Sequence, residues 1–148
     1  MSSEANKEVI NRLFEECWNQ GNTRVVDELC DPDAIQFDPT YPEGLDNAGF
    51  KQFLTTYRTA FPDVRMTISD LIGEDDTVAV SWSAMGTHRG ELMGIPPTGK
   101  QVTVEGISIY QFANDQIVSS NTSWDLYGML QQLGAIPQSQ QQSKEIGQ

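Results

Sequence analysis

The sequence predicts an α+β fold in which three helices precede a curved antiparallel sheet. Apolar residues recur at three- and four-residue spacing through segments 9–18, 25–29 and 50–61, which is the period of an α-helix with one buried face. From residue 64 onward, apolar and polar residues alternate over four long stretches separated by turn residues, as they do in β-strands. A block of helices followed by a block of strands is typical of an α+β domain.

The first helix is predicted to begin at a Ser2–Ser3 cap and to stop before Gly21. A short second helix is predicted at 23–29, and Pro32 is expected to end that segment. Residues 34–37 are then a candidate for a short strand.

The third helix is predicted to start with Asn47 as its cap and to run to Ala60, where Pro62 closes it. Segment 38–46 before it holds two prolines and a glycine and is predicted to be a loop. One face of this helix is aromatic and is expected to meet the core. It carries Phe50, Phe53, Tyr57 and Phe61.

The sheet is predicted to contain four long antiparallel strands. They cover residues 64–72, 77–87, 101–112 and 116–124. Segment 90–100 carries three glycines and two prolines and is expected to leave the sheet as a long excursion. A last helix is predicted at 126–133. Residues 1–137 are therefore expected to form one domain, and the Gln/Ser-rich segment 138–148 to be a flexible tail.

The chain carries 21 acidic and 9 basic residues, for a formal net charge of −12. Such a surface repels phosphate backbones and anionic lipid, so nucleic acid and membranes are not expected as partners. The N-terminus lacks a signal-peptide pattern, and no apolar run approaches the ~20 residues of a membrane span. We expect a cytoplasmic protein, with Cys17 and Cys30 as buried, reduced thiols rather than a disulfide or reactive thiols.

Four parts of the sequence carry a family resemblance. They are WNQGN at 18–22 with DPD at 31–33, GFKQF at 49–53 running into FPD at 61–63, GTHRGE at 86–91 followed by GIPPTGK at 94–100, and WDL at 124–126 followed by LQQLG at 130–134. In this order they resemble the SnoaL-like polyketide and ester cyclases of the nuclear transport factor 2-like superfamily, and the resemblance covers almost the whole chain before residue 138.

The resemblance implies a cone-shaped fold around a hydrophobic cavity, and a homodimer or homotetramer built on the exposed sheet face. It also implies intramolecular aldol cyclisation of a polyketide-like carbonyl compound without metal or other cofactor. In the family, a carboxylate at the end of the last strand is the general acid/base, and Asp125 matches it here.

The last strand departs from the family's pattern. Many relatives carry Glu-His-Trp or a similar triplet where this chain has Ser119-Ser120-Asn121. Alternate residues of a strand share a face, so Ser119, Asn121 and Asp125 are expected on one side. If that side faces the cavity, the cavity is roomier and is lined by small hydrogen-bonding groups.

Residue chemistry allows two opposite roles for Asp125. Between Trp124 and Leu126, a carboxyl group that faces the cavity would lose solvation, which raises its pKa toward the range of a general acid/base. Alternatively, Asp125 caps the following helix and accepts backbone N–H groups near Tyr127 or Gly128, which would lower its pKa.

Other candidate site residues also have two interpretations. His88, the only histidine, either binds substrate at the cavity mouth or orders the 90–100 excursion by hydrogen bonding. Tyr57 is the best placed tyrosine to hold an enolate oxygen, although such tyrosines are commonly core residues. Trp18, Phe53 and Trp82 are core residues that would double as cavity wall. One histidine and two separate cysteines predict no metal site.

We therefore expect a cofactor-free cyclase or isomerase that acts on a small hydrophobic carbonyl ligand. Asp125 would be its acid/base, and Asn121, Tyr57 or His88 would hold the developing oxyanion. One alternative is a non-catalytic binding protein of the same fold. The replacement of the family's triplet by Ser119-Ser120-Asn121 favours this alternative. Another is an interaction protein that uses only the exposed sheet face.

Overall fold

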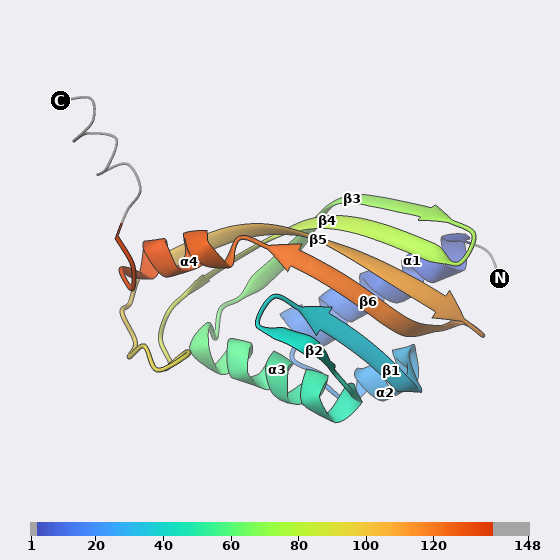
Figure 1. Cartoon of the computed structure of the whole chain (residues 1–148), viewed down its shortest axis with the longest axis horizontal. Helices are drawn as coiled ribbons and strands as arrows, with labels where there is room; N and C mark the ends of the chain where they lie inside the picture. Colours follow the sequence, from blue (N-terminus) through green and yellow to red (C-terminus); the bar gives the residue numbers. More distant parts are fainter. Residues whose placement is uncertain (1–2, 138–148) are drawn as a thin grey trace.

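A strongly curved, six-stranded sheet dominates the computed structural model of the protein, which describes residues 3–137 (Figure 1). The strands are β1 (Cys30–Asp38), β2 (Tyr41–Leu45), β3 (Arg65–Glu74), β4 (Thr77–Thr87), β5 (Gln101–Ala113) and β6 (Gln116–Trp124). Their order in the sheet is β2-β1-β6-β5-β4-β3, and all neighbours are antiparallel except β1 and β6, which are parallel. The predicted α+β class and curved sheet are confirmed, with one parallel pair added. The predicted tail at 138–148 lies outside the described residues.

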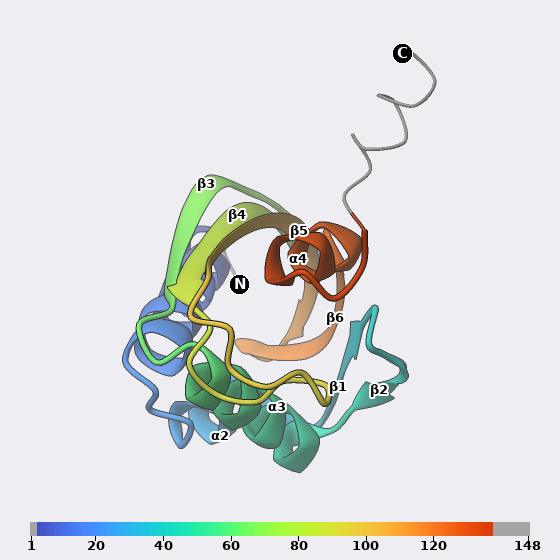
Figure 2. The same ribbon diagram turned by 90° about the vertical axis from the view of Figure 1, so that its left-hand side faces the viewer.

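The helical segments of residues 3–137 lie mostly inside this curve. They are α1 (Ser3–Arg12), the π-helical η1 (Leu13–Asn19), α2 (Val25–Leu29), α3 (Asn47–Ala60) and α4 (Leu126–Leu133). Figure 2 shows the sheet wrapping from β3 round to β2, with α1, α2 and α3 on its inner side and α4 beside the end of β5. None of these helices is both long and apolar enough to cross a membrane.

The first two helical segments form the single N-terminal helix that the sequence predicts. It ends before Gly21, which has a φ of +78°. The guanidinium of Arg58 on α3 donates from Nη1 to the carbonyls of Trp18 and Asn19, at 2.6 and 3.2 Å, and so satisfies two terminal carbonyls of η1. A Cβ at position 21 would lie 2.6 Å from Nε of that arginine. Both the left-handed backbone and the close approach therefore favour glycine here.

Two predictions before α3 differ from the structure. The second helix ends at Leu29, ahead of Pro32, but the strand predicted at 34–37 is longer and begins at Cys30. Pro32 lies inside this strand, between Cys30 and Ile35, where the register of β1 with β6 shifts and no ladder bond from the N–H of residue 32 is required. Segment 38–46 is not wholly a loop, because it contains the edge strand β2. Pro42 is tolerated in this strand because an edge strand has only one neighbour to bond.

The third helix has the predicted length but a different cap. Asp46, not Asn47, is the N-cap, and its Oδ1 accepts the Gly49 N–H at 2.8 Å. The Asn47 side chain instead donates to the carbonyl of Asp31 at 2.9 Å and so ties the start of α3 to β1.

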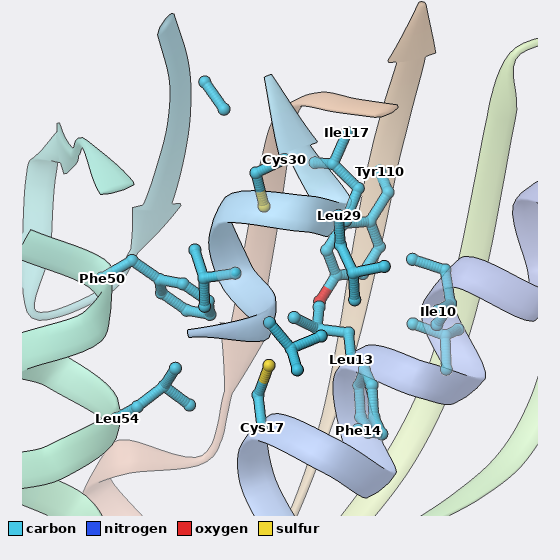
Figure 3. Close-up of a cluster of buried hydrophobic side chains, with 14 of the residues drawn as sticks. Ile10, Leu13, Phe14, Cys17, Leu29, Cys30, Phe50, Leu54, Tyr110 and Ile117 are labelled. Carbon is cyan, nitrogen blue, oxygen red and sulfur yellow. The ribbon is translucent and has the colours of Figure 1, made fainter. Parts of the chain in front are cut away.

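The main core lies where η1, α2 and α3 face β1, β5 and β6 (Figure 3). Cys17 and Cys30 are free and buried in it, as predicted. Burial raises the pKa of each thiol to about 12, because the charged thiolate is poorly solvated there.

Candidate functional site

An apolar cavity lies between the concave face of the sheet and the helices. Most of the side chains that line it are aliphatic or aromatic, including Phe14, Phe37, Phe50, Phe61, Val104 and Met129. The space open to the centres of water-sized molecules is about 110 Å³, whereas about 10–15 Å³ of such space holds one water. The cavity is therefore large enough for a small organic molecule.

Four predicted site residues lie at the cavity wall: Trp18, Phe53, Tyr57 and Trp82. The Phe53 ring meets Trp18 edge-on at 6.0 Å and packs against the Tyr57 ring at 4.8 Å. The Tyr57 ring in turn meets Trp124 edge-on at 6.2 Å. These contacts join η1, α3 and β6 in one aromatic wall. The location of these residues fits the predicted role in binding, which itself stays a prediction.

Gly106 of β5 makes room for two of the aromatic residues that line the cavity. It lies between Trp82 of β4 and Trp124 of β6 in the register of the sheet. A Cβ at position 106 would lie 2.4 Å from Cζ2 of Trp82 and 2.8 Å from Cβ of Trp124. The absence of a side chain therefore lets the Trp82 indole occupy the space above Gly106 at the sheet floor of the cavity.

Hydrogen-bonding groups run across the same floor. The Trp82 indole N–H donates to Oγ of Ser108 at 3.0 Å, and this hydroxyl is 2.8 Å from Oγ1 of Thr122. One row further along, Ser120 donates to Oε1 of Gln36 at 2.9 Å. Ser108, Ser120 and Gln36 are all buried, and each has a hydrogen-bond partner in these contacts.

Asp38 is the one described residue of the cavity lining that carries a carboxyl group. Its Oδ1 accepts the Trp124 indole N–H at 3.0 Å, and its Oδ2 accepts the backbone N–H and the hydroxyl of Thr40 at 3.0 and 2.7 Å. Sequence reasoning missed this residue because it placed Asp38 in a loop. The sequence signal that could have identified Asp38 is its spacing from Gln36. Two residues apart in an extended strand, these side chains lie on the same side of β1.

Tyr57 presents an ionisable hydroxyl to the same cavity. Burial raises its pKa, and the nearby charge of Asp38 raises it further, so the protonated phenol is strongly favoured. The hydroxyl makes no hydrogen bond to any other residue within 3–137. It is therefore free to donate to a ligand oxygen.

The expectation that Asp125 faces the cavity is wrong. Its side chain is exposed and caps α4, where Oδ1 accepts the Gly128 N–H at 2.8 Å. It does not belong to the cavity lining. Residue chemistry allowed two roles for Asp125, and the structure shows the capping role. Asp125 follows the last residue of β6 and precedes the first turn of α4, which is the position of an N-cap.

Ser119 and Asn121 do not line the cavity either, because they lie on the outer face of β6. The cavity face of β6 carries Ser120, Thr122 and Trp124 instead. In the pairing of β6 with β5, Phe112 faces Ile117 and Gln111 faces Ser119, so β6 has one extra residue at this point. Such a bulge reverses which residues face inward, and no turn residue in the sequence marks it.

His88 does not line the cavity either. Its buried Nδ1 accepts the backbone N–H of Thr98 at 3.2 Å and lies 3.1 Å from the hydroxyl of the same residue. Its backbone also pairs with Lys100 and Gly99, and its ring packs on Phe61 at 5.5 Å. His88 therefore orders the excursion between β4 and β5, which was the alternative interpretation of this residue.

Metal ligands are not grouped in residues 3–137, where no three His, Cys, Asp or Glu side chains could hold one ion together. Polar contacts of the cavity come instead from hydroxyl, amide, indole and carboxyl groups of β1, β4, β5, β6 and α3.

Comparison with known proteins places this architecture in a family. The chain is similar to two proposed polyketide cyclases of known structure. One is IdmH from Streptomyces antibioticus, with 31% identity, 87% of this chain and 98% of that chain covered, and a TM-score of 0.75. The other is from Acidithiobacillus ferrooxidans, with 32% identity, 91% and 99% coverage, and a TM-score of 0.77.

A third structure shares the fold. It is AclR from Streptomyces galilaeus, a proposed hydroxylase with 23% identity, 92% and 100% coverage, and a TM-score of 0.82. No curated protein matches the chain significantly. The family description that matches is "SnoaL-like polyketide cyclase", over residues 8–133. Because this match covers most of the chain, the protein belongs to the SnoaL-like polyketide cyclase family.

Proposed function

We propose that the protein binds a small apolar carbonyl compound in its cavity and catalyses a cofactor-free cyclisation or isomerisation of that compound. The observation that carries the proposal is the cavity itself, whose aromatic walls surround a few hydrogen-bonding groups. Membership of the SnoaL-like family supports a cyclase-type function, as do two similar structures described as proposed polyketide cyclases.

The composition of the cavity fits a neutral polyketide-like ligand. Aromatic faces such as Trp18 and Phe53 suit flat, conjugated carbon chains, and apolar walls exclude the water that would compete for an enolate. The hydroxyls of Ser108 and Thr122 can orient a carbonyl oxygen. No anion-binding cluster of Lys or Arg side chains belongs to the described lining, so a neutral ligand fits better than a phosphorylated one.

A second candidate function is storage or transport of such a compound without chemistry. The capping role of Asp125 favours it, because that carboxylate is unavailable to the cavity. Ser120 and Thr122, on the cavity face of β6, supply hydroxyls but no ionisable group.

Turnover of a polyketide mimic separates these candidates. The probe is nonane-2,4,6,8-tetraone, in which a carbon between two carbonyls can attack a terminal carbonyl and, with loss of one water, give 2,4-dihydroxy-6-methylacetophenone. Its binding is followed by quenching of tryptophan fluorescence, and the product by chromatography with mass spectrometry. We expect binding and faster formation of this product than in buffer.

A matched pair of variants ties the result to the cavity. Ala84→Phe fills the cavity from β4, whereas Ala113→Phe adds the same side chain at the exposed end of β5, outside the cavity lining. We expect only the first to lose binding and cyclisation. Binding without product in the wild type would favour the storage function, and equal effects of the two variants would contradict a cavity site.

We also propose that the protein forms a homodimer or homotetramer through the outer sheet face. Ile107 and Ile109 of β5 are 56% and 42% exposed there, and Ile72 of β3 is 65% exposed. Small side chains, Ser81 and Ser123, stand opposite Ile107 on the neighbouring strands and would allow close approach. Sedimentation equilibrium tests this proposal: Ile107→Lys should shift the protein toward monomer, and a monomeric wild type would contradict it.

A further inference from the structure

The carboxyl group of Asp38 lies at the cavity wall and keeps one hydrogen-bonding position that no protein group fills among the described residues. It is only partly exposed, and three donors converge on it: the Trp124 indole and the two groups of Thr40. This is the arrangement that an ionised carboxylate accepts. A carboxylate offers about four lone-pair positions, so three bonds leave one free position on Oδ1, the oxygen held by the cavity residue Trp124.

A hydrogen-bond donor without a protein partner lies beside this carboxylate. The Tyr57 ring meets the ring of Trp124 edge-on, and the charge of Asp38 is close enough to act on the Tyr57 hydroxyl. Tyr57 belongs to the cavity lining, and its hydroxyl makes no hydrogen bond within the described residues. A carboxylate acceptor and a phenol donor therefore face the same space from β1 and α3.

The other polar groups of the lining cannot exchange a proton as readily. The hydroxyls of Ser108, Thr122 and Ser120 and the Gln36 amide are neutral groups already hydrogen-bonded in two pairs, Ser108 with Thr122 and Ser120 with Gln36. Tyr110 is buried, and burial raises its pKa. Among the described lining residues, Asp38 is thus the group suited to take and return a proton.

We infer that Asp38 is the general acid/base of the cavity, that Tyr57 donates the hydrogen bond to the developing enolate oxygen, and that the substrate is a doubly activated carbon acid. This inference rests on the proposed function. Carboxylates are weak bases compared with the enolates of simple ketones, and proton transfer is efficient when the base matches the acid. The carbon must therefore be acidified by two groups, as it is between two carbonyls or between a carbonyl and an aromatic ring.

The chemical steps balance without a co-reactant. Oδ1 of Asp38 takes a proton from the activated carbon, and the electron pair of the broken C–H bond forms an enolate whose oxygen accepts the Tyr57 hydrogen bond. The enolate carbon attacks a second carbonyl of the same molecule. A carbon–carbon bond forms, the π bond of that carbonyl breaks, and its oxygen takes the proton back from Asp38. The aldol product has the atoms of the substrate, and the carboxylate is restored.

Deuterium exchange tests the proton transfer alone, without any need for cyclisation. The probe is 2-tetralone, an apolar bicyclic ketone whose benzylic carbon lies next to the carbonyl. In D₂O, loss of the benzylic proton signal is followed by NMR, and binding is followed separately by tryptophan fluorescence. We expect wild-type protein to bind the ketone and to accelerate exchange.

Three variants assign the groups. Asp38→Asn keeps the size and most hydrogen bonds of the side chain, and we expect it to bind 2-tetralone while exchange falls about a hundredfold. Tyr57→Phe should lower exchange about tenfold or more, because it removes the oxyanion donor. Asp70→Asn, which changes an exposed carboxylate on the opposite face of the sheet, is the matched control and should exchange like the wild type.

The outcomes separate this inference from the proposed function. If the Asp38→Asn variant binds 2-tetralone and still exchanges it, Asp38 is not the acid/base. The same holds if exchange is lost in Asp125→Asn instead. Either result would leave the cavity as the ligand site. Failure of the wild type to bind 2-tetralone would overturn the proposed binding function, and this inference with it.

Discussion

The indole N–H of Trp124, at the end of β6, donates a 3.0 Å hydrogen bond to Oδ1 of Asp38, at the end of β1. These strands are parallel neighbours, so their ends meet at the same rim of the sheet. This hydrogen bond holds the carboxylate against the cavity wall. The Trp124 ring also packs edge-on against the Tyr57 ring. One side chain thus orients both members of the proposed proton-transfer pair.

Trp124→Phe tests this positioning. The change keeps an aromatic ring but removes a hydrogen bond to a charged group, which contributes about 1.5–3 kcal/mol. We expect the rate constant of 2-tetralone exchange to fall at least about tenfold, with little change in the concentration for half-saturation. The matched control is Trp82→Phe, which removes the same donor from Ser108. Equal losses in the two variants would contradict a specific role for Trp124.

Gly106→Ala tests the packing of the cavity floor. The added methyl group would lie 2.4 Å from the Trp82 ring and 2.8 Å from Cβ of Trp124, so one of these residues must move. Overpacking of this kind costs about 1–3 kcal/mol. We expect a lower free energy of unfolding in urea and weaker binding of 2-tetralone. Unchanged affinity would show that the ligand does not touch this part of the floor.

Asp125→Ala tests the capping role. Loss of a helix N-cap costs about 1 kcal/mol, and Asp46→Ala removes the corresponding bond at α3. We expect both variants to lose stability by a similar amount in urea unfolding. A fully stable Asp125→Ala protein would be at odds with the cap.

The two thiols give a pH-dependent prediction. The pKa of Cys17 and of Cys30 is raised to about 12 in the folded protein, so both stay neutral well above the pKa of an unfolded cysteine. Their contribution to stability is complete below the unfolded pKa and is lost as the pH rises toward 12. We expect a disulfide reagent at pH 8 to modify neither thiol in native protein and both in denaturant. Rapid modification of the native protein would contradict this burial.

Local sequence signals predicted much of the fold. The bounds of β4, β6 and α4 match the structure, because turn residues, an alternating pattern and a helix-ending Gly134 mark them. The edge strand β2 was missed, since its one proline and one glycine are typical of loops and only the neighbouring β1 gives it a partner.

The site could be predicted only in part, because its faces depend on register. The aromatic residues of the helices were assigned to the wall by their spacing, which a helix fixes locally. The face of β6 depends on a bulge at residues 117–119, which only the pairing with β5 reveals. Asp38 was missed for a similar reason: its place in the cavity follows from the parallel pairing of β1 with β6, which joins residues far apart in the sequence.

The rate of tetraketone cyclisation in Asp38→Asn, measured beside Asp125→Asn, tests the proposed chemistry most directly. Both variants remove one carboxylate, but only Asp38 lines the cavity. We predict that Asp38→Asn binds the tetraketone and loses cyclisation by about a hundredfold, whereas Asp125→Asn cyclises it at close to the wild-type rate. Cyclisation that persists in Asp38→Asn and vanishes in Asp125→Asn would contradict an acid/base on the cavity wall.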